Sequence, residues 1–224
     1  MMRWSYHNDM PVSSNIKKTE SGPRVRTRRI LLDAAMGLLQ RGIVPSVTDV
    51  AEEAEVSRAT AYRYFPTQAA LIREAIDAAL GPILNWESDT DSVEMRVDEL
   101  IEFSYPRMNQ FEATHRGALL VAMDQWSRKK AGMLGNESPV VRGNRKMLLA
   151  KVLAPLQPVL PPAEFDRLCQ SLSLVFGIEA LVVLKDIWGL DAQGAQDVAL
   201  WAARALVQGA ITQEQLGSSV SGGA

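Results

Sequence analysis

The sequence contains few of the side chains from which proteins build metal and acid–base centres. Its 224 residues include one cysteine, Cys169, and two histidines, His7 and His115. A single cysteine cannot form an intramolecular disulfide and excludes a cysteine-rich metal site. The two histidines are far apart in the sequence, which leaves little material for a histidine-based centre. We therefore expect no metal site and no cofactor.

The sequence also lacks a long hydrophobic run. Uncharged apolar segments such as residues 180–184 are far shorter than the roughly 20 residues that a membrane-spanning helix needs. Residues 1–15 are polar and mixed, without the hydrophobic stretch of a signal peptide. These absences predict a cytoplasmic protein with no membrane partner.

The chain as a whole has no excess of positive charge. It has 24 Lys and Arg against 26 Asp and Glu, a net charge of −2, so nucleic-acid contacts would require a local basic patch. Residues 1–73 have 11 basic and 7 acidic side chains, whereas residues 74–224 have 13 and 19. The densest run of basic residues comprises Lys17, Lys18, Arg24, Arg26, Arg28 and Arg29. A basic run of this kind is usually a solvated tail and helix start, so its meaning depends on the adjoining segment of the chain.

Helical periodicity is abundant along the chain. With 47% hydrophobic and 22% charged residues, the composition is that of a folded protein with a sizeable core. Apolar residues recur at spacings of three and four, and no segment alternates with the period of two that is typical of strands. We predict an all-α protein with helices near residues 23–41, 46–54, 58–65, 68–80, 93–112, 114–131, 139–156, 162–188 and 192–211.

The two short helices at residues 46–65 have the spacing of a helix-turn-helix, in which the second helix lies in the DNA major groove. Ser46 and Asp49 form a capping pair at the start of the first helix. Ser57 is the expected cap of the second helix, which Pro66 ends, and it leaves the amino end of that helix free to face phosphate. Ala51 is small enough to let the helices pack closely. A simple helical hairpin remains an alternative on this pattern alone.

The residues that carry a family resemblance are TRRILLDAA at 27–35, Gly42, VAEEAEVSRATAYRYFP at 50–66, and Leu71. Over about residues 24–75 the sequence resembles the DNA-binding domain of the tetracycline-repressor (TetR) family. This resemblance implies an all-helical homodimeric transcription regulator, usually a repressor. It also implies release from operator DNA when a small molecule binds in the C-terminal domain.

The resemblance implies roles for individual side chains of the N-terminal domain. Arg28 and Thr48 match positions that contact phosphate, and Ser57 caps the recognition helix. Three side chains match positions that read base edges or adjoining phosphates, and two tyrosines match positions that hydrogen-bond to phosphate. The predicted DNA-binding residues are therefore Arg28, Thr48, Ser57, Arg58, Thr60, Tyr62, Arg63 and Tyr64.

Three positions depart from the family pattern. Glu55 replaces the usual glycine of the turn, where a left-handed conformation costs about 1–2 kcal/mol. Ala61 replaces a larger apolar residue, and Gln68 replaces a lysine that would meet phosphate. These departures keep an alternative open, a helical partner-binding protein that has the fold but weak or no DNA binding.

Beyond residue 80 the family motif gives no guidance, so the C-terminal region is interpreted from its own pattern. The helix predicted at residues 162–188 is apolar on nearly every side and must be covered on more than one face. It is either a central core helix or a helix that packs on its own subunit and on a twofold mate. The resemblance implies the second arrangement, with residues 192–211 completing an intersubunit four-helix bundle. The expected dimer interface contains Leu174, Ile178, Leu181, Val182, Trp201 and Leu206.

A ligand cavity is expected near residues 93–131. Pro106 falls inside a predicted helix and should kink it, which leaves internal space. Apolar side chains would line the cavity, and Tyr105, Asn109 or His115 would supply polar groups; ordinary core packing is the alternative for each. The candidate residues for an unidentified small-molecule effector are Phe103, Tyr105, Met108, His115, Met123 and Trp126.

The predicted organisation has four parts: a flexible basic arm at residues 1–22, a helix-turn-helix DNA-binding domain at 23–80, a C-terminal ligand-binding and dimerisation domain at 81–216, and a disordered tail at 217–224. The predicted partners are double-stranded operator DNA, a second copy of the chain and the effector. An enzyme is disfavoured because the sequence has no Gly-rich phosphate loop, nucleophile elbow or metal-spaced cluster.

Overall fold

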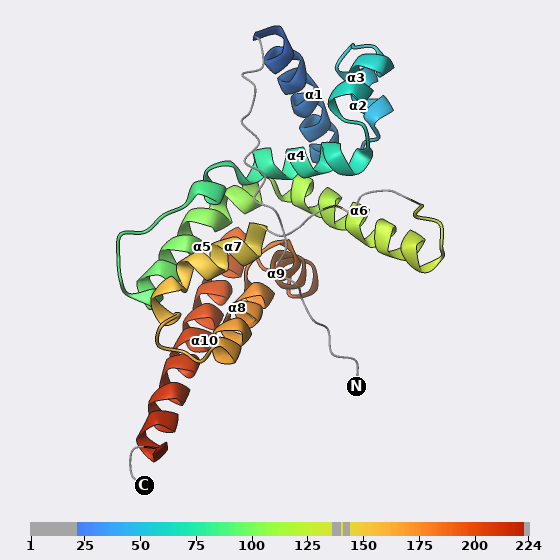
Figure 1. Cartoon of the computed structure of the whole chain (residues 1–224). Coiled ribbons are helices and arrows are strands. Elements are labelled where there is room, and N and C mark those ends of the chain that lie inside the picture. Colours follow the sequence, from blue (N-terminus) through green and yellow to red (C-terminus); the bar gives the residue numbers. More distant parts are fainter. Residues whose placement is uncertain (1–21, 136–139, 141–143, 222–224) are drawn as a thin grey trace.

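A computed structural model describes residues 22–135, 140 and 144–221 (Figure 1). All the regular structure in these residues is helical, which confirms the all-α prediction. Of the predicted arm, only residue 22 lies inside the described part, where it begins the first helix. The elements are α1 (Gly22–Gln40), α2 (Val47–Glu53), α3 (Arg58–Tyr64), α4 (Gln68–Leu80), α5 (Val93–Gln110), α6 (Glu112–Lys130), α7 (Asn144–Val152), α8 (Pro162–Val175), α9 (Ile178–Val182) and α10 (Ala192–Ser221), with 3₁₀ segments η1 (Gly81–Asn85) and η2 (Ala154–Leu156) and a π-helical segment η3 (Val183–Ile187).

Hydrogen bonds from side chains fix the ends of the short N-terminal helices. The Asp49 amide donates to Ser46 Oγ (3.2 Å) and the Ser46 amide donates to Asp49 Oδ2 (2.8 Å), which is the predicted capping box. Ser57 Oγ accepts the Thr60 amide (3.2 Å) at the start of α3, also as predicted. Thr67 caps α4 in the same way. These local contacts set where α2, α3 and α4 begin.

A compact apolar cluster joins α1, α2, α3 and the first turn of α4. Ala51 and Ala61 are almost fully buried at the crossing of α2 and α3, so small side chains permit the close packing that the sequence indicates. Phe65, just after α3, is also buried. The other buried members of this cluster are Leu31, Ala35, Leu38, Val47, Val50 and Leu71.

Helix α4 lies between the three N-terminal helices and the C-terminal bundle (Figure 1). Leu39 of α1 approaches α6 so closely that a Cβ atom on Gly117 would lie 2.3 Å from its Cδ2 atom. At the far end of α4, the Arg107 guanidinium of α5 donates to the carbonyl oxygens of Ala78 and Leu80, both at 3.0 Å. These bonds satisfy carbonyl groups that a helix end leaves open. The contact between α1 and α6 and the bonds at the end of α4 therefore couple the N-terminal helices to the C-terminal helices.

The largest core lies among the C-terminal helices. Helix α10 packs on α5 and α8, and it turns a line of small residues inward at Ala195, Ala199, Ala203 and Val207. The four-residue spacing places them on one face of the helix. Aliphatic side chains of α5, α7 and α8 fill the rest of this core. The same core holds Tyr105, whose hydroxyl donates to the Val175 carbonyl oxygen at 2.7 Å.

The prediction of one continuous helix over residues 162–188 is wrong. The chain breaks after α8 at Phe176, which has an extended backbone, and at Gly177, which has a φ of +127°. A Cβ atom on Gly177 would lie 2.2 Å from the Arg145 guanidinium, so this position needs glycine for its conformation and for its space. The chain then continues as α9 and the π-helical η3 at an angle of 43° to α8.

Other helix boundaries also differ from those predicted. Helix α10 continues to Ser221, so the backbone of residues 217–221 is helical where a separate tail is expected, and residues 222–224 lie outside the described part. Helix α7 begins at Asn144, and most of the preceding segment expected to be helical also lies outside that part. Helix α5 continues through Pro106 to Gln110.

The described helices were also compared with the length and hydropathy of a membrane span. None of them meets both requirements alone, and the bent pair Pro162–Val175 and Ile178–Ile187 meets them when its parts are taken together.

Candidate DNA interface and ligand cavity

The turn between α2 and α3 is tight and contains a non-glycine residue in the left-handed region. Glu55 has a φ of +53°, and it alone among the described non-glycine residues has a positive φ. The Val56 amide donates to the Ala51 carbonyl oxygen at 3.0 Å and closes the turn. Glu55 therefore occupies the turn position where the family pattern has glycine, and the turn accepts its side chain.

Helix α3 has one buried side and one exposed side. Ala61 faces the core, whereas Arg58, Tyr62 and Arg63 are exposed. The Tyr62 hydroxyl lies 3.4 Å from Thr48 Oγ1 at the start of α2, so both helices contribute to one polar surface. We call this surface, made of Thr48, Ser57, Arg58, Thr60, Tyr62, Arg63 and Tyr64, the α3 face.

Acidic residues border the α3 face and are paired with arginines. Arg58 bonds to Glu52 at 2.7 Å, with both side chains about two-thirds exposed. Arg41 at the end of α1 bonds to both carboxylate oxygens of Glu53, and the hydrogen bond lowers the pKa of this carboxyl group. Pairing reduces the negative charge that these carboxylates would otherwise present to a polyanion.

Arg28 has a more internal position than its predicted contact with phosphate requires. Its guanidinium forms an ion pair with Glu74 of α4 and lies 5.8 Å from the centre of the Phe65 ring. Arg28 therefore joins α1 to α4 and to the residue after α3. Gln68 has a comparable structural role that sequence reasoning missed, because its side-chain amide donates to the Pro45 carbonyl oxygen at 3.0 Å.

A cavity of about 80 Å³ lies where α4 meets the C-terminal helices. Ile76 and Leu80 of α4 form one wall, and Met108 of α5 forms another. His115 of α6 lines it together with residues of α7 and of the break between α8 and α9. Of the predicted ligand-binding residues, Met108 and His115 are thus in the cavity lining.

His115 is buried without a hydrogen-bond partner at Nε2. Its side chain and backbone are together 8% exposed. Burial lowers the pKa of His115 to about 4, and the positive charge of Arg107 acts in the same direction. The imidazole is therefore neutral at pH 7, with one polar nitrogen unsatisfied beside an apolar cavity.

The remaining predicted ligand-binding residues do not line this cavity. Tyr105 is buried in the C-terminal core, where its hydroxyl is already bonded to Val175. Phe103 is half-exposed and borders an open depression near η1. Met123 and Trp126 are exposed to 61% and 63% on the outer side of α6. They lie outside the lining of this cavity, because α6 turns its opposite side inward.

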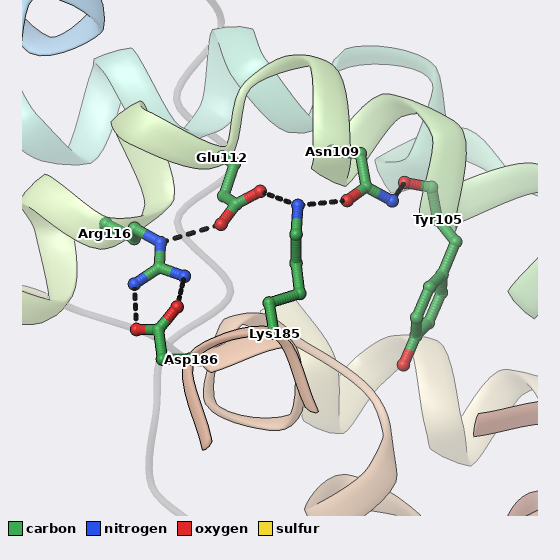
Figure 2. Close-up of polar contacts among 6 residues, drawn as sticks. All are labelled: Tyr105, Asn109, Glu112, Arg116, Lys185 and Asp186. Carbon is green, nitrogen blue, oxygen red and sulfur yellow. Dashed lines mark hydrogen bonds and ion pairs between the residues drawn. The ribbon is translucent and has the colours of Figure 1, made fainter. Parts of the chain in front are cut away.

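A polar network connects the α5–α6 junction to η3 (Figure 2). Lys185 of η3 contacts Asn109 at 3.1 Å and also pairs with Glu112. Arg116 bonds to Glu112 and, through two bonds of 2.7 Å, to Asp186. Burial alone would raise the pKa of Glu112, but the bonds from Lys185 and Arg116 outweigh it and lower the pKa. The network holds the π-helical segment against the first turn of α6.

The residues predicted for a dimer interface fall into two groups. Leu174 and Trp201 are exposed to 76% and 73%. In contrast, Ile178 and Leu181 are buried within the subunit. Val182 and Leu206 are partly buried against the same core. Other exposed apolar side chains occur nearby in sequence, at Val183, Ile187, Trp188 and Val198.

The described residues contain no group of three or more His, Cys, Asp and Glu side chains arranged to hold a metal ion. Cys169 is partly buried against the C-terminal core, and burial raises the pKa of its thiol. The polar features with an evident geometry are thus the α3 face, the cavity beside His115 and the network at η3.

Helices α2 and α3, with their tight turn and the exposed α3 face, define a helix-turn-helix domain joined to a larger helical domain. Residues 31–75 match the family model for bacterial regulatory proteins of the tetR family. The N-terminal domain is a tetR-family domain, and the resemblance found in the sequence is confirmed.

Two individual proteins extend this comparison. Over 54 residues the chain is 46% identical to the HTH-type transcriptional repressor LfrR of Mycolicibacterium smegmatis. That match covers 24% of this chain and 29% of the relative, so it spans less than a third of the relative's length. A crystal structure of a tetR-family transcriptional regulator from Streptomyces coelicolor is similar with a TM-score of 0.61 and 17% identity, over 87% of this chain and 86% of that chain. The likeness to this structure extends the shared fold into the C-terminal helices.

Proposed function

We propose that this protein is a transcriptional repressor that binds palindromic operator DNA as a homodimer and is released by a small molecule. Residues 23–80 form its DNA-binding domain, and the helices after residue 80 form its dimerisation and ligand-binding domain. The α3 face enters the major groove, where Arg58 and Arg63 contact base edges or adjoining phosphates.

The observation that carries the proposal is the two-sided character of α3. Its inner side is fixed by Ala61, and its start is fixed by the Ser57 cap. The opposite side exposes Arg58, Tyr62 and Arg63. Helix α3 itself lies on the far side of α4 from the C-terminal helices (Figure 1). A seven-residue helix is too short to be stable alone, so its neighbours hold this polar side in place.

The exposed apolar side chains of α8, η3 and α10 support the homodimer. Leu174, Ile187, Trp188 and Trp201 are each more than 70% exposed in the single chain. Apolar groups of this size favour burial against another surface. A twofold dimer buries them and presents two α3 helices to two operator half-sites.

The position of the cavity supports a response to a small molecule. Ile76 and Leu80 belong to α4, which packs against α1 and is bonded at its end by Arg107. A molecule that occupies the cavity presses on α4 and thereby shifts the N-terminal domain. Operator affinity then depends on the differential binding of the effector to the two arrangements.

The test is selection of duplexes from a random library, followed by fluorescence anisotropy with the selected duplex at several salt concentrations. Arg58→Ala should weaken binding at least about fivefold, in line with the roughly 1–3 kcal/mol of a base contact. Arg167→Ala is a matched control, because Arg167 is also an exposed arginine paired with a glutamate, Glu164 at 2.9 Å. It should leave DNA affinity within twofold.

Two results would contradict the proposal. The first is the absence of any enriched palindromic duplex at low ionic strength, which would favour a partner-binding protein without operator specificity. The second is equal DNA affinity for the Arg58 and Arg167 variants. Sedimentation of each variant verifies that neither substitution alters the assembly.

A further inference from the structure

We infer that the cavity beside His115 binds a small uncharged molecule that is mostly apolar and carries one hydroxyl group, with phenol as the simplest representative. This inference rests on the proposed function, because it names the chemical class of the effector. Three observations support it: the buried His115 Nε2 atom without a hydrogen-bond partner, the charged groups around the cavity, and the volume of the cavity.

His115 lines this cavity, and its Nε2 atom is buried without a hydrogen-bond partner among the described residues. Leaving such an atom buried and unbonded costs free energy, which a ligand hydrogen bond recovers. A hydroxyl group both donates and accepts, so it satisfies Nε2 in either tautomer of the neutral ring. The apolar walls formed by Ile76, Leu80 and Met108 require apolar atoms.

The polar groups of α7 at the cavity are engaged elsewhere. Arg145 donates to the Ser173 carbonyl oxygen at 2.8 Å and forms an ion pair with Glu179. The Asn144 amide donates to Asp77 at 3.1 Å. Among the lining residues, His115 Nε2 is the fully buried side-chain polar atom that has no partner in the described part of the chain.

The charges around the cavity select against ions. A cation would meet the guanidinium of Arg145 in the lining and would find no carboxylate among the lining residues. An anion would lose its hydration against apolar walls, and the nearest guanidinium already has Glu179 as its counter-ion. A neutral molecule avoids both costs.

The size of the cavity connects binding to movement of α4. A cavity of roughly 150 Å³ holds one benzene ring, whereas this cavity measures about 80 Å³. A six-membered ring is therefore fully enclosed only when a wall moves outward. The wall formed by Ile76 and Leu80 belongs to the helix that supports the DNA-binding domain, so outward movement of this wall would displace α4.

The experiment measures binding of phenol, benzene, benzoate and benzylammonium to the full-length protein at pH 7 by calorimetry. Phenol should bind about five- to tenfold more tightly than benzene, the ratio expected for one net hydrogen bond. The two ions should bind more weakly than either neutral molecule. In wild-type protein, the ring protons of His115 should shift in the NMR spectrum when phenol is added.

Two variants assign the hydrogen bond. His115→Phe keeps an aromatic ring but cannot bond to the hydroxyl, so phenol affinity should fall to that of benzene. Thr114→Val is the control, because Thr114 is the adjacent buried residue with an unpartnered hydroxyl outside the cavity lining. It should leave the preference for phenol unchanged. Ala118→Met fills the cavity from α6 and should abolish binding of both neutral molecules.

Equal affinity of wild-type protein for phenol and benzene, a preference for either ion, or full phenol affinity in His115→Phe would each overturn the inference. DNA release is measured separately by anisotropy. If phenol binds through His115 but leaves a selected duplex bound, the ligand class stands and the proposed release is wrong. If no duplex is selected while phenol binds, the proposed DNA function fails and the ligand class again stands.

Discussion

Arg58 and Glu52 form an ion pair at the edge of the α3 face, and under the proposed function this pair limits how readily the arginine reaches DNA. The carboxylate of Glu52 lies 2.7 Å from the guanidinium and is itself exposed. DNA must compete with this carboxylate for Arg58, and the carboxylate also repels nearby phosphates. Glu52 is therefore expected to restrain DNA affinity.

Replacement of Glu52 by glutamine tests this restraint. Glu52→Gln should raise DNA affinity about two- to fivefold, because it removes one negative charge near the phosphates and releases Arg58. Anisotropy titrations with the selected duplex measure the change. Glu164→Gln removes the partner of Arg167 on α8 and should have no effect on DNA affinity. A decrease in affinity for Glu52→Gln would instead show that Glu52 positions Arg58 for binding.

At the scale of a single side chain, His115 makes the free energy of unfolding depend on pH. Its pKa is about 4 in the folded chain against 6.5 for an ordinary histidine. Between these values the unfolded chain binds a proton that the folded chain does not, so the free energy of unfolding falls as the pH falls. The charged groups facing it are Arg107 on α5 and Arg145 on α7, the latter paired with Glu179.

Comparison of wild-type protein with His115→Phe isolates this contribution. Between pH 7 and pH 4, the wild-type free energy of unfolding should fall by on the order of 3 kcal/mol more than that of the variant. Urea titrations at several pH values measure both proteins, and carboxyl groups contribute equally to each. Parallel pH profiles would contradict the assignment of a buried neutral imidazole.

At the scale of elements, the turn between α2 and α3 contains strain that a glycine would relieve. Glu55 adopts its φ of +53° with an exposed side chain. Glu55→Gly should therefore increase the free energy of unfolding by about 1 kcal/mol, as measured in urea. Ala59→Gly, at an exposed position inside α3, should decrease it by about the same amount. Destabilisation by both changes would show that Glu55 is not strained.

Local signals in the sequence predicted the N-terminal elements well. The capping box of Ser46 and Asp49 and the Ser57 cap depend on residues three positions apart, so the sequence alone specifies them. The break at Gly177 depends on Arg145, a side chain 32 positions earlier that occupies the space beside the glycine. The apolar pattern of residues 162–188 does not reveal this contact. Gly177 within it was the one sequence signal that could have indicated the break.

Helix α6 shows why the candidate cavity residues were only partly predictable. Its inner side carries Ala118 and Val121 together with the polar Thr114, His115 and Gln125, whereas large apolar side chains such as Trp126 are outside. Hydrophobicity therefore does not distinguish the inner side of this helix from the outer side. Close contact of Gly117 with Leu39 determines which side faces inward, and that contact joins two distant parts of the chain.

At the scale of the whole molecule, the exposed apolar surface of α8, η3 and α10 is expected to join two copies. Leu174→Asp combined with Trp201→Asp places charges on this surface and should convert the dimer into a monomer at micromolar concentration. Analytical ultracentrifugation measures the mass. Met133→Asp changes another apolar side chain that is about two-thirds exposed, beyond α6, and should leave the dimer intact. A wild-type monomer would contradict the dimer itself.

The contact between Gly117 and Leu39 has a consequence for the geometry of the operator. Because Gly117 has no side chain, the Leu39 side chain of α1 packs directly against the backbone of α6 at this point. In the proposed twofold dimer, any larger residue at position 117 would tilt the two N-terminal domains symmetrically toward or away from the axis. The preferred number of base pairs between operator half-sites would change, even though position 117 contacts no base.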